Sequence, residues 1–396
     1  MGLVLVTGRT CPERAGGPLR VRIAHAQRSM AEAGLDALLL ISSPNLVYLS
    51  GASVVELTAG RAWYLLVPRT DAPTLVVQDW RKAEAVRTSW LTDVRSYRRL
   101  SKVPFDQLDD LWESHRLANG IVGAELGAEL QLGVPWLDFE ELRAHFSTTR
   151  FVDASDLLWR LRMVKDEGEI EFIRRACRIT ADAYGSTFAG ASAGMPGREL
   201  VWRMKSGMLA AGGSDPWVLS SFGPGSYDFG TASPDDRALE PGHMLWMDAG
   251  CSVGGYWSDF SRAAVVGRAS PEQRDLQRAI HEVTAEGVDM IRPGRPVAEI
   301  AARCNEAVAR LGVPVTTPLS SLAGRIGHGL GLDVTELPHV AEHDPTVLVP
   351  GMVITVEPGV ATTYGTFHVE ENVLVTEHSH EVLSVSPWEL MEVKTR

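Results

Sequence analysis

Residues Leu245–Val266, LWMDAGCSVGGYWSDFSRAAVV, are predicted to form two short strands that fold back on each other. Asp248 and Asp259 are equidistant from Val253-Gly254. A hairpin that turns at this dipeptide would place the two aspartates directly opposite each other, on one face. Two facing carboxylates on an otherwise apolar hairpin repel unless a positive charge lies between them. The stretch therefore predicts a divalent metal held between its strands.

A second copy of this pattern occurs further along the chain. Residues 241–250, PGHMLWMDAG, match residues 350–359, PGMVITVEPG, as P-G, five residues, an acidic residue, one residue and a glycine. In the second copy the acidic residues are Glu357 and Glu370, which are equidistant from Thr363-Tyr364. The repeat predicts a second hairpin that also carries a facing pair of carboxylates.

Each copy also follows a predicted helix, which opens after Gly194 in the first copy and after Gly294 in the second. Residues 153–396 are therefore predicted to form one domain of two similar helix-plus-hairpin halves. Four carboxylates that converge from two hairpins are strongly unfavourable by themselves, and two divalent cations would neutralise them.

An imidazole ligand is expected at His328, which stands between glycines in RIGHGLGL, where backbone can approach a site closely. Oxygen ligands with one imidazole suit Mn²⁺, Fe²⁺, Co²⁺ or Zn²⁺, and the residues do not choose among these four metals. Glu370 and Glu371 are adjacent, and only one of them can face inward on a strand. The symmetry of the hairpin selects Glu370.

The N-terminal part of the chain alternates short apolar runs with helical patterns, which is typical of an α/β domain. Residues 1–17 are interpreted as a leader, and residues 18–152 as this domain, so that the whole chain is α+β. The predicted strands cover 36–42, 62–68, 72–78 and 120–125, and the predicted helices cover 20–33, 81–87, 105–116 and 137–146.

Composition narrows the range of functions. The 396-residue chain has a formal net charge of −12 and no block of lysine and arginine, which argues against nucleic acid or an anionic membrane as a partner. We find neither a secretory signal nor an apolar run long enough to cross a membrane. The four cysteines have no CxxC spacing. A cytoplasmic protein is expected.

The residues singled out above resemble the dinuclear site of the pita-bread metallopeptidase family (M24), which includes methionine aminopeptidase, aminopeptidase P, prolidase and creatinase. The resemblance rests on the motifs MDAGCSVGGYWSDFSR, GHGLGLDVTELP, PGMVITVEPG and FHVEENVLVT. The run DALLLISSPNLVYLSG is similar to the creatinase/prolidase N-terminal domain. The family implies a pita-bread C-terminal domain, a homodimer and five metal ligands: Asp248, Asp259, His328, Glu357 and Glu370.

The resemblance implies a hydrolase of C–N bonds that acts on short peptides in the manner of an Xaa-Pro dipeptidase or aminopeptidase P. Two divalent ions would hold a bridging hydroxide, and Glu357 would act as general base. The alternative is a non-peptidase relative acting on a small molecule, similar to creatinase, ectoine hydrolase or dimethylsulfoniopropionate lyase. A non-catalytic binding module is a third class, but such members have lost ligands that are all present here.

The chain departs from the peptidase pattern around the substrate. Histidines that the family uses to hold the scissile carbonyl correspond to Thr231 and Thr335, and a further one found in aminopeptidase P corresponds to Gly324. Threonine can donate a hydrogen bond but cannot carry an imidazolium proton. His368 lies two residues before Glu370 and is expected on the same strand face. We therefore expect substrate contacts from Thr231, Thr335, His339 and His368.

Overall fold

The structure is a computed structural model that describes residues 17–53, 61–98, 102–223, 233, 235–311 and 317–395. The chain divides into two compact units, with the split after Arg162. The sequence placed this boundary between residues 152 and 153. The difference is helix α6 (Ser155–Met163), in which the Trp159 indole donates a hydrogen bond to the Ala128 carbonyl of the N-terminal unit at 3.1 Å.

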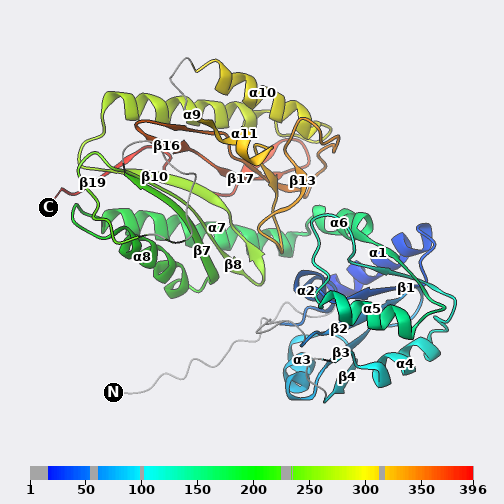
Figure 1. Cartoon of the computed structure of the whole chain (residues 1–396). Coiled ribbons are helices and arrows are strands. Elements are labelled where there is room, and N and C mark those ends of the chain that lie inside the picture. The colour runs from blue at the N-terminus through cyan, green and yellow to red at the C-terminus, as the bar shows by residue number, and fades with distance from the viewer. Residues whose placement is uncertain are drawn as a thin grey trace, which may run out of the picture. The chain divides into compact units, whose positions relative to one another are not determined.

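The N-terminal unit is built on one six-stranded sheet with the order β4-β3-β2-β1-β5-β6 (Figure 1). Its central strand β1 pairs with β2 in antiparallel and with β5 in parallel fashion. The elements before α6 are α1 (Gly17–Glu32), β1 (Ala37–Leu40), α2 (Ser43–Ser50), β2 (Tyr64–Pro68), β3 (Thr74–Gln78), the 3₁₀ helix η1 (Asp79–Arg81), α3 (Lys82–Thr88), β4 (Asp93–Tyr97), α4 (Phe105–Ser114), β5 (Ile121–Ala124), α5 (Trp136–His145) and β6 (Arg150–Asp153).

All four strands predicted for this unit are present, and so are the four helices. Two further strands, β4 and β6, were not predicted. They are the two edges of the sheet, and their sequences DVRSY and RFVD mix charged with apolar residues, as edge strands often do. The predicted leader lies outside the described residues, except for Gly17.

The C-terminal unit has the duplicated arrangement that the sequence predicted. A pair of helices precedes a hairpin in each half: α7 and α8 before β8 and β10, then α9 and α10 before β14 and β17. Its elements are α7 (Glu167–Ala189), α8 (Gly197–Ala210), β7 (Ser214–Gly223), β8 (Met244–Val253), β9 (Tyr256–Trp257), β10 (Phe260–Val266), α9 (Pro271–Asp289), α10 (Val297–Ala309), β11 (Thr317–Pro318), α11 (Leu319–Ala323), β12 (His328–Gly329), β13 (Glu336–His339), β14 (Val353–Val356), β15 (Gly359–Thr362), β16 (Gly365–His368), β17 (Glu371–Val375), β18 (His380–Val382) and β19 (Met391–Val393).

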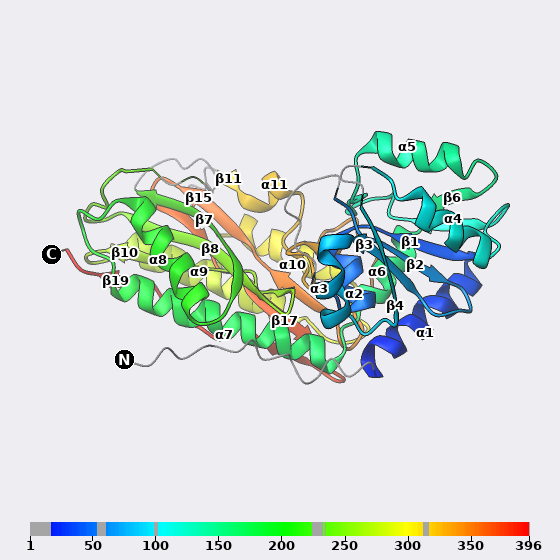
Figure 2. The same ribbon diagram turned by 90° about the horizontal axis from the view of Figure 1, so that it is seen from below.

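The strands of this unit form a layer between two layers of helices. Figure 1 shows α7 and α8 on one side of the strands and α9 and α10 on the other. Figure 2, viewed from the side of α7, shows this helix running along the strands. The sheet of the first half has the order β19-β10-β8-β7, and that of the second half the order β13-β12-β14-β17-β18. A third sheet, β11-β15-β16, completes the second half.

Helix α7 fixes the strands of the first half. It begins with a capping box, in which the side chain of Asp166 accepts from the Glu169 amide and that of Glu169 accepts from the Asp166 amide. Its buried face includes Tyr184, whose hydroxyl lies 2.9 Å from the Met247 carbonyl and 2.8 Å from the Phe260 carbonyl. The helix therefore contacts both strands that flank the predicted aspartate pair.

Apolar packing joins the two halves into one core. Trp246 and Val265 of the first half belong to the same buried cluster as Ile280, Ile354 and Val373 of the second. No helix within the described ranges is long and apolar enough to cross a membrane.

Candidate active site

The first acidic pair comes from the hairpin of β8 and β10. The strand register pairs Asp248 with Ser261 rather than with Asp259, so the predicted direct opposition is wrong. The turn lies at Gly254-Gly255, one residue later than predicted, because both glycines adopt the positive φ (62° and 91°) that a two-residue type I′ turn requires. Moving the turn by one residue shifts the register by two. The aspartates thus become diagonal neighbours and remain on one face.

The second acidic pair follows the prediction. The registers Val356–Glu371 and Gly359–His368 place Glu357 and Glu370 directly opposite each other, between the paired strands. The Glu370 side chain is completely buried. Glu371 points the other way, where its carboxylate forms an ion pair with Arg262 at 2.9 Å. The choice of Glu370 over Glu371 as the inward-facing residue is confirmed.

The glycine that ends the repeated motif allows a close approach in both halves. A Cβ on Gly250 would overlap the carbonyl oxygen of Ser258, just before Asp259. A Cβ on Gly359 would lie 2.6 Å from Cδ2 of His368. The absence of a side chain therefore makes room for different neighbours in the two halves.

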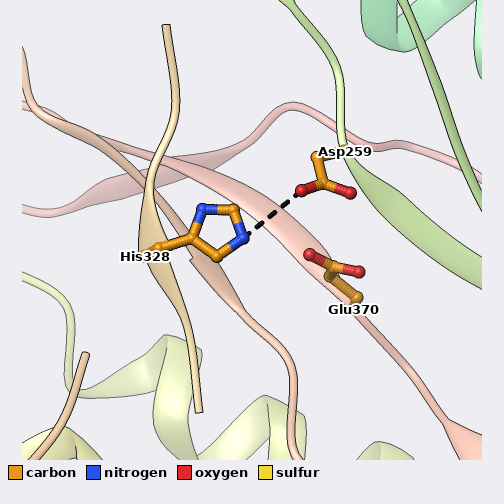
Figure 3. Close-up of side chains that lie close together, drawn as sticks. All are labelled: Asp259, His328 and Glu370. Atoms are coloured by element: carbon orange, nitrogen blue, oxygen red, sulfur yellow. Dashed lines mark ion pairs between the residues drawn. The ribbon is translucent and has the colours of Figure 1, made fainter. Parts of the chain in front are cut away.

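His328 lies among the carboxylates, on β12. Its Nε2 is 3.3 Å from Oδ2 of Asp259 and 3.6 Å from Oε1 of Glu357. Its Nδ1 is 2.8 Å from the Gly329 carbonyl, which only accepts hydrogen bonds, so Nδ1 carries a proton and donates it there. Figure 3 shows the imidazole turned toward Asp259, with Glu370 beside it. This orientation is the one that metal-binding histidines adopt.

His368 occupies a similar position in the second half. Its Nε2 lies 3.7 Å from Oε2 of Glu357, and its Nδ1 lies 2.8 Å from the hydroxyl of Ser261. That hydroxyl donates to the His368 carbonyl at 3.0 Å, so it accepts the proton of Nδ1. The Nε2 lone pair of the neutral ring therefore faces a carboxylate, which is repulsive unless a proton or a metal ion lies between them.

Two sets of ligand atoms result, and Glu370 belongs to both. Asp259, His328 and Glu370 form one set, and Glu357, His368 and Glu370 the other, each with its ligand atoms within 4.8 Å of one another. The sequence interpreted His368 as a substrate residue, whereas its position equally suits a ligand. Strand alternation already placed it on the face of Glu370, so the signal was present in the sequence.

The buried carboxylates lack the donors that would satisfy them. Oδ1 of Asp248, Oδ1 of Asp259 and both carboxylate oxygens of Glu370 are buried without a hydrogen-bond donor. Buried polar atoms are almost always paired, so four unpaired acceptors in one place indicate a missing positive group. Oxygen and imidazole donors fit Mn²⁺, Co²⁺, Zn²⁺ or Fe²⁺. The donor set thus fits a pair of divalent cations.

The pKa values agree with this interpretation. Burial, together with the neighbouring negative charges, raises the pKa values of Asp248 and Glu370 well above their ordinary range. Burial also raises the pKa of Asp259, although hydrogen bonding to His328 acts against the shift. For Glu357 burial would raise the pKa, but the His368 hydrogen bond and the charges of both histidines lower it. Among these carboxyl groups, Glu357 is thus the one whose pKa is lowered when positively charged imidazoles rather than metal ions lie beside it.

Residues behind the site hold the ligand-bearing backbone in place. The Asn372 side chain accepts from the Asp259 amide at 3.0 Å and donates to the Asp259 carbonyl. Arg262 donates to the Glu370 carbonyl at 2.8 Å. The sequence interpretation missed both residues. Alternation along β17 puts Asn372 on the same face as Glu370, which is the one signal that pointed to it.

The predicted substrate residues are partly brought together. His339 pairs directly with His328 in the β12–β13 register, so their side chains lie on the same face. Arg325, which the sequence interpretation did not single out, lies 3.0 Å from Nδ1 of His339 and 3.3 Å from Oγ1 of Thr335. Thr231 lies outside the described residues.

Two carboxylate–imidazole clusters that share one glutamate, on a duplicated helix-plus-hairpin domain, define a metal-dependent hydrolase. Comparison with known families gives the same result. Residues 171–377 match metallopeptidase family M24, and residues 22–164 match the creatinase/prolidase N-terminal domain. The chain belongs to metallopeptidase family M24, as the resemblance of its motifs predicted.

Known proteins and solved structures are similar to this chain along almost its whole length. An Xaa-Pro dipeptidase of Pyrococcus horikoshii is 28% identical over 366 residues, which cover 91% of this chain and 96% of that protein. An Xaa-Pro dipeptidase of Pyrococcus furiosus is 27% identical over 377 residues, with 94% and 100% covered. The crystal structure of the prolidase from Pyrococcus horikoshii OT3 superposes with a TM-score of 0.79 at 26% identity and covers 94% of this chain and 100% of that one.

Proposed function

We propose that this protein is a dinuclear-metal-dependent hydrolase that cleaves Xaa-Pro dipeptides. The observation that carries the proposal is the pair of clusters that share Glu370, with four buried carboxylate oxygens that lack a donor. The similarity to Xaa-Pro dipeptidases over more than nine-tenths of the chain supports the substrate class. The non-peptidase alternative has no comparable support.

The proposed ligands are Asp248, Asp259, His328, Glu357 and Glu370, with His368 as an additional donor to the second cluster. Two divalent ions, manganese as first choice, would supply water that ionises near neutral pH and would polarise the scissile carbonyl. His328 and His368 offer Nε2 lone pairs toward the clusters, because their Nδ1 atoms donate hydrogen bonds elsewhere.

Glu357 is proposed as the general base. Its side chain is 20% exposed, whereas those of Asp259 and His328 are 5% and 4% exposed, so it borders the space that a substrate can reach. Its carboxylate can accept a proton from the attacking water. It can then pass this proton to the leaving nitrogen, which in an Xaa-Pro peptide is the proline nitrogen.

The proposal also includes a homodimer that works in the cytoplasm. Cys177, Cys251 and Cys304 are free and buried, which is compatible with a reducing compartment. Light scattering on the purified protein tests the assembly. A monomer at assay concentration would remove the dimer from the proposal without affecting the chemistry.

Metal analysis and a substrate panel test the function together. We expect about two Mn²⁺ per chain in metal-replete wild-type protein and their loss in Asp259→Ala. Manganese-loaded wild type should release proline from Ala-Pro and Gly-Pro, and should leave Ala-Ala and creatine intact. Glu357→Gln should abolish this release. Glu377→Gln, which changes an exposed glutamate of the same unit, should behave as wild type.

Either of two results would contradict the proposal. Wild-type protein that binds no metal under metal-replete conditions removes the hydrolytic mechanism. Metal-loaded protein that cleaves creatine but no proline dipeptide replaces the peptidase assignment with the small-molecule alternative.

A further inference from the structure

Ser261 joins the two halves of the candidate active site through its hydroxyl. It lies on β10, where the strand register pairs it with Asp248 of the first half. Its Oγ lies 2.8 Å from Nδ1 of His368 and 3.0 Å from the His368 carbonyl, and both of these atoms belong to the second half. The Ser261 side chain is completely buried, so this hydroxyl cannot reach a substrate as a nucleophile. What it can do for the site is therefore set by its contacts with His368.

The positions of the protons follow from these contacts. The His368 carbonyl only accepts hydrogen bonds, so the single proton of the Ser261 hydroxyl points to it, and the hydroxyl oxygen accepts the proton of Nδ1. The opposite arrangement would place the ring proton on Nε2. However, Oε2 of Glu357 lies 3.7 Å from Nε2, which is too long for a hydrogen bond. Ser261 thus leaves Nε2 of His368 with a lone pair directed toward the second cluster.

Packing holds the His368 ring in the same orientation. The fully buried Trp246 packs against it edge-to-face, with 5.5 Å between the ring centroids and an interplanar angle of 75°. Gly359 leaves room for the ring, since a Cβ there would lie 2.6 Å from Cδ2 of His368. These two contacts restrict where the ring lies, but neither decides which nitrogen carries the proton. The hydrogen bond to Ser261 decides it.

The two clusters differ in how their imidazoles are held. Nδ1 of His328 donates to the backbone carbonyl of Gly329, which no substitution removes. Nδ1 of His368 donates to a side chain, that of Ser261. Such outer hydrogen bonds fix the orientation of a ligating histidine and raise its basicity. A change at Ser261 should therefore affect one cluster and spare the other.

We propose that Ser261 is a positioning residue for the second metal site: it keeps His368 in the form that can bind a divalent ion together with Glu357 and Glu370. This inference rests on the proposed function in one respect, that divalent ions bind at the two clusters. It adds the residue that controls the occupancy of one of them. Because Glu357, the proposed general base, belongs to the same cluster, Ser261 acts on the chemistry from behind the site.

Calorimetric titration of metal-free protein with Mn²⁺ tests the proposal without any substrate. Wild type should bind two ions per chain. Ser261→Ala should weaken the binding of one ion by about 10–100-fold and leave that of the other unchanged. Ser261→Thr keeps the hydroxyl and should bind both ions as wild type does. Ser252→Ala is the matched control, because Ser252 is a buried serine of the neighbouring strand β8 whose hydroxyl donates to Asp215 rather than to a histidine.

A double variant distinguishes action through His368 from a general effect on the strand. His368→Phe keeps a ring against Trp246 and removes the ligand atom, so it should weaken the same ion. Ser261→Ala should then have no further effect in the His368→Phe protein, because the hydrogen bond that it breaks is already absent. Circular dichroism and the melting temperature of the metal-free protein show whether each variant is folded. If Ser261→Ala is not folded, Ser261→Cys replaces it, since sulfur fills the space but accepts hydrogen bonds only weakly.

Three results would overturn the inference. Ser261→Ala with both Mn²⁺ affinities unchanged would show that the hydroxyl is not needed. A further loss from Ser261→Ala in the His368→Phe protein, as large as in wild type, would show that it does not act through His368. Wild type that binds a single ion would leave no second site to position. Cleavage of Ala-Pro is measured separately: protein that binds two ions in a Ser261-dependent way but cleaves no dipeptide would refute the proposed peptidase function and support this inference.

Discussion

The ion pair between Lys165 and Glu336 allows a quantitative prediction. The Lys165 ammonium lies 2.9 Å from Oε2 of Glu336, and both side chains are 1% exposed. At the separation of 2.9 Å and an effective dielectric constant of about 20, the attraction is about 6 kcal/mol. Desolvation cancels much of this in the intact pair, but removing one partner leaves the other charge buried alone, at a cost of about 3–5 kcal/mol.

Lys165→Met and Glu336→Gln should therefore each lower the free energy of unfolding by about 3–5 kcal/mol. The double variant should be less destabilised than the sum of the two by about 3 kcal/mol, because no isolated charge remains. Glutamine is the informative replacement for Glu336, since its side-chain oxygen can still accept from the Leu332 amide, a hydrogen bond that Glu336 accepts at 2.9 Å. The substitution thus removes the charge and keeps this contact.

The two units need not unfold together, so the assay must report on the C-terminal one. We suggest urea unfolding of metal-free protein, followed by hydrogen exchange in peptides that cover β12 and β13. The exposed pair of Arg310 and Glu306 provides the control, and Arg310→Met should cost less than about 1 kcal/mol. Single variants at Lys165 and Glu336 that cost as little as this control, or a double variant that equals the sum, would refute the reasoning.

Three further predictions concern the metal site. In metal-free protein, the raised pKa values of Asp248, Asp259 and Glu370 mean that the folded state binds protons more tightly than the unfolded state. Stability should therefore fall as the pH rises above the ordinary carboxyl range of about 4, and added Mn²⁺ should remove this fall, which thermal unfolding with and without metal will show. A melting temperature of the metal-free protein that rises with pH over this range would contradict the predicted fall in stability. Asn372→Leu removes both side-chain hydrogen bonds to the Asp259 backbone. It should weaken Mn²⁺ binding by about 10–100-fold in calorimetric titrations. An unchanged Mn²⁺ affinity would show that these two hydrogen bonds are not needed for metal binding. Glu371→Gln breaks the ion pair with Arg262 and should cost about 3 kcal/mol in stability while two metals still bind; loss of a metal would mean that Glu371 is itself a ligand.

Much of the fold followed from local patterns. Helices α8 and α10 were predicted to open after Gly194 and Gly294, and they begin at Gly197 and Val297. The inner strands of the N-terminal sheet are continuous apolar runs, whereas the edge strands β4 and β6 contain charged residues and were not predicted. The duplication of the C-terminal half was visible because the motif of P-G, five residues, an acidic residue, one residue and a glycine occurs twice.

The parts of the site that depend on turn symmetry and on strand alternation could be predicted from the sequence. Glu357 and Glu370 lie opposite each other because the turn at Thr363-Tyr364 is the one that symmetry selects. The same symmetry argument gave the wrong pairing for Asp248 and Asp259. The turn lies at Gly254-Gly255 because these two glycines readily adopt the positive φ that the turn requires. Contacts such as that of Arg325 with His339 depend on how distant strands pair, which no local pattern specifies.

The glycine that ends each copy of the repeat has a consequence for how the two halves tolerate mutation. At Gly250 any side chain would collide with backbone, whereas at Gly359 it would meet the side chains of His368 and Leu319. In a library that varies both positions, we expect every substitution at 250 to be lost with the folded protein. At 359, alanine should survive as folded protein with altered activity. We therefore expect glycine to be required for folding at position 250 and for catalysis at position 359.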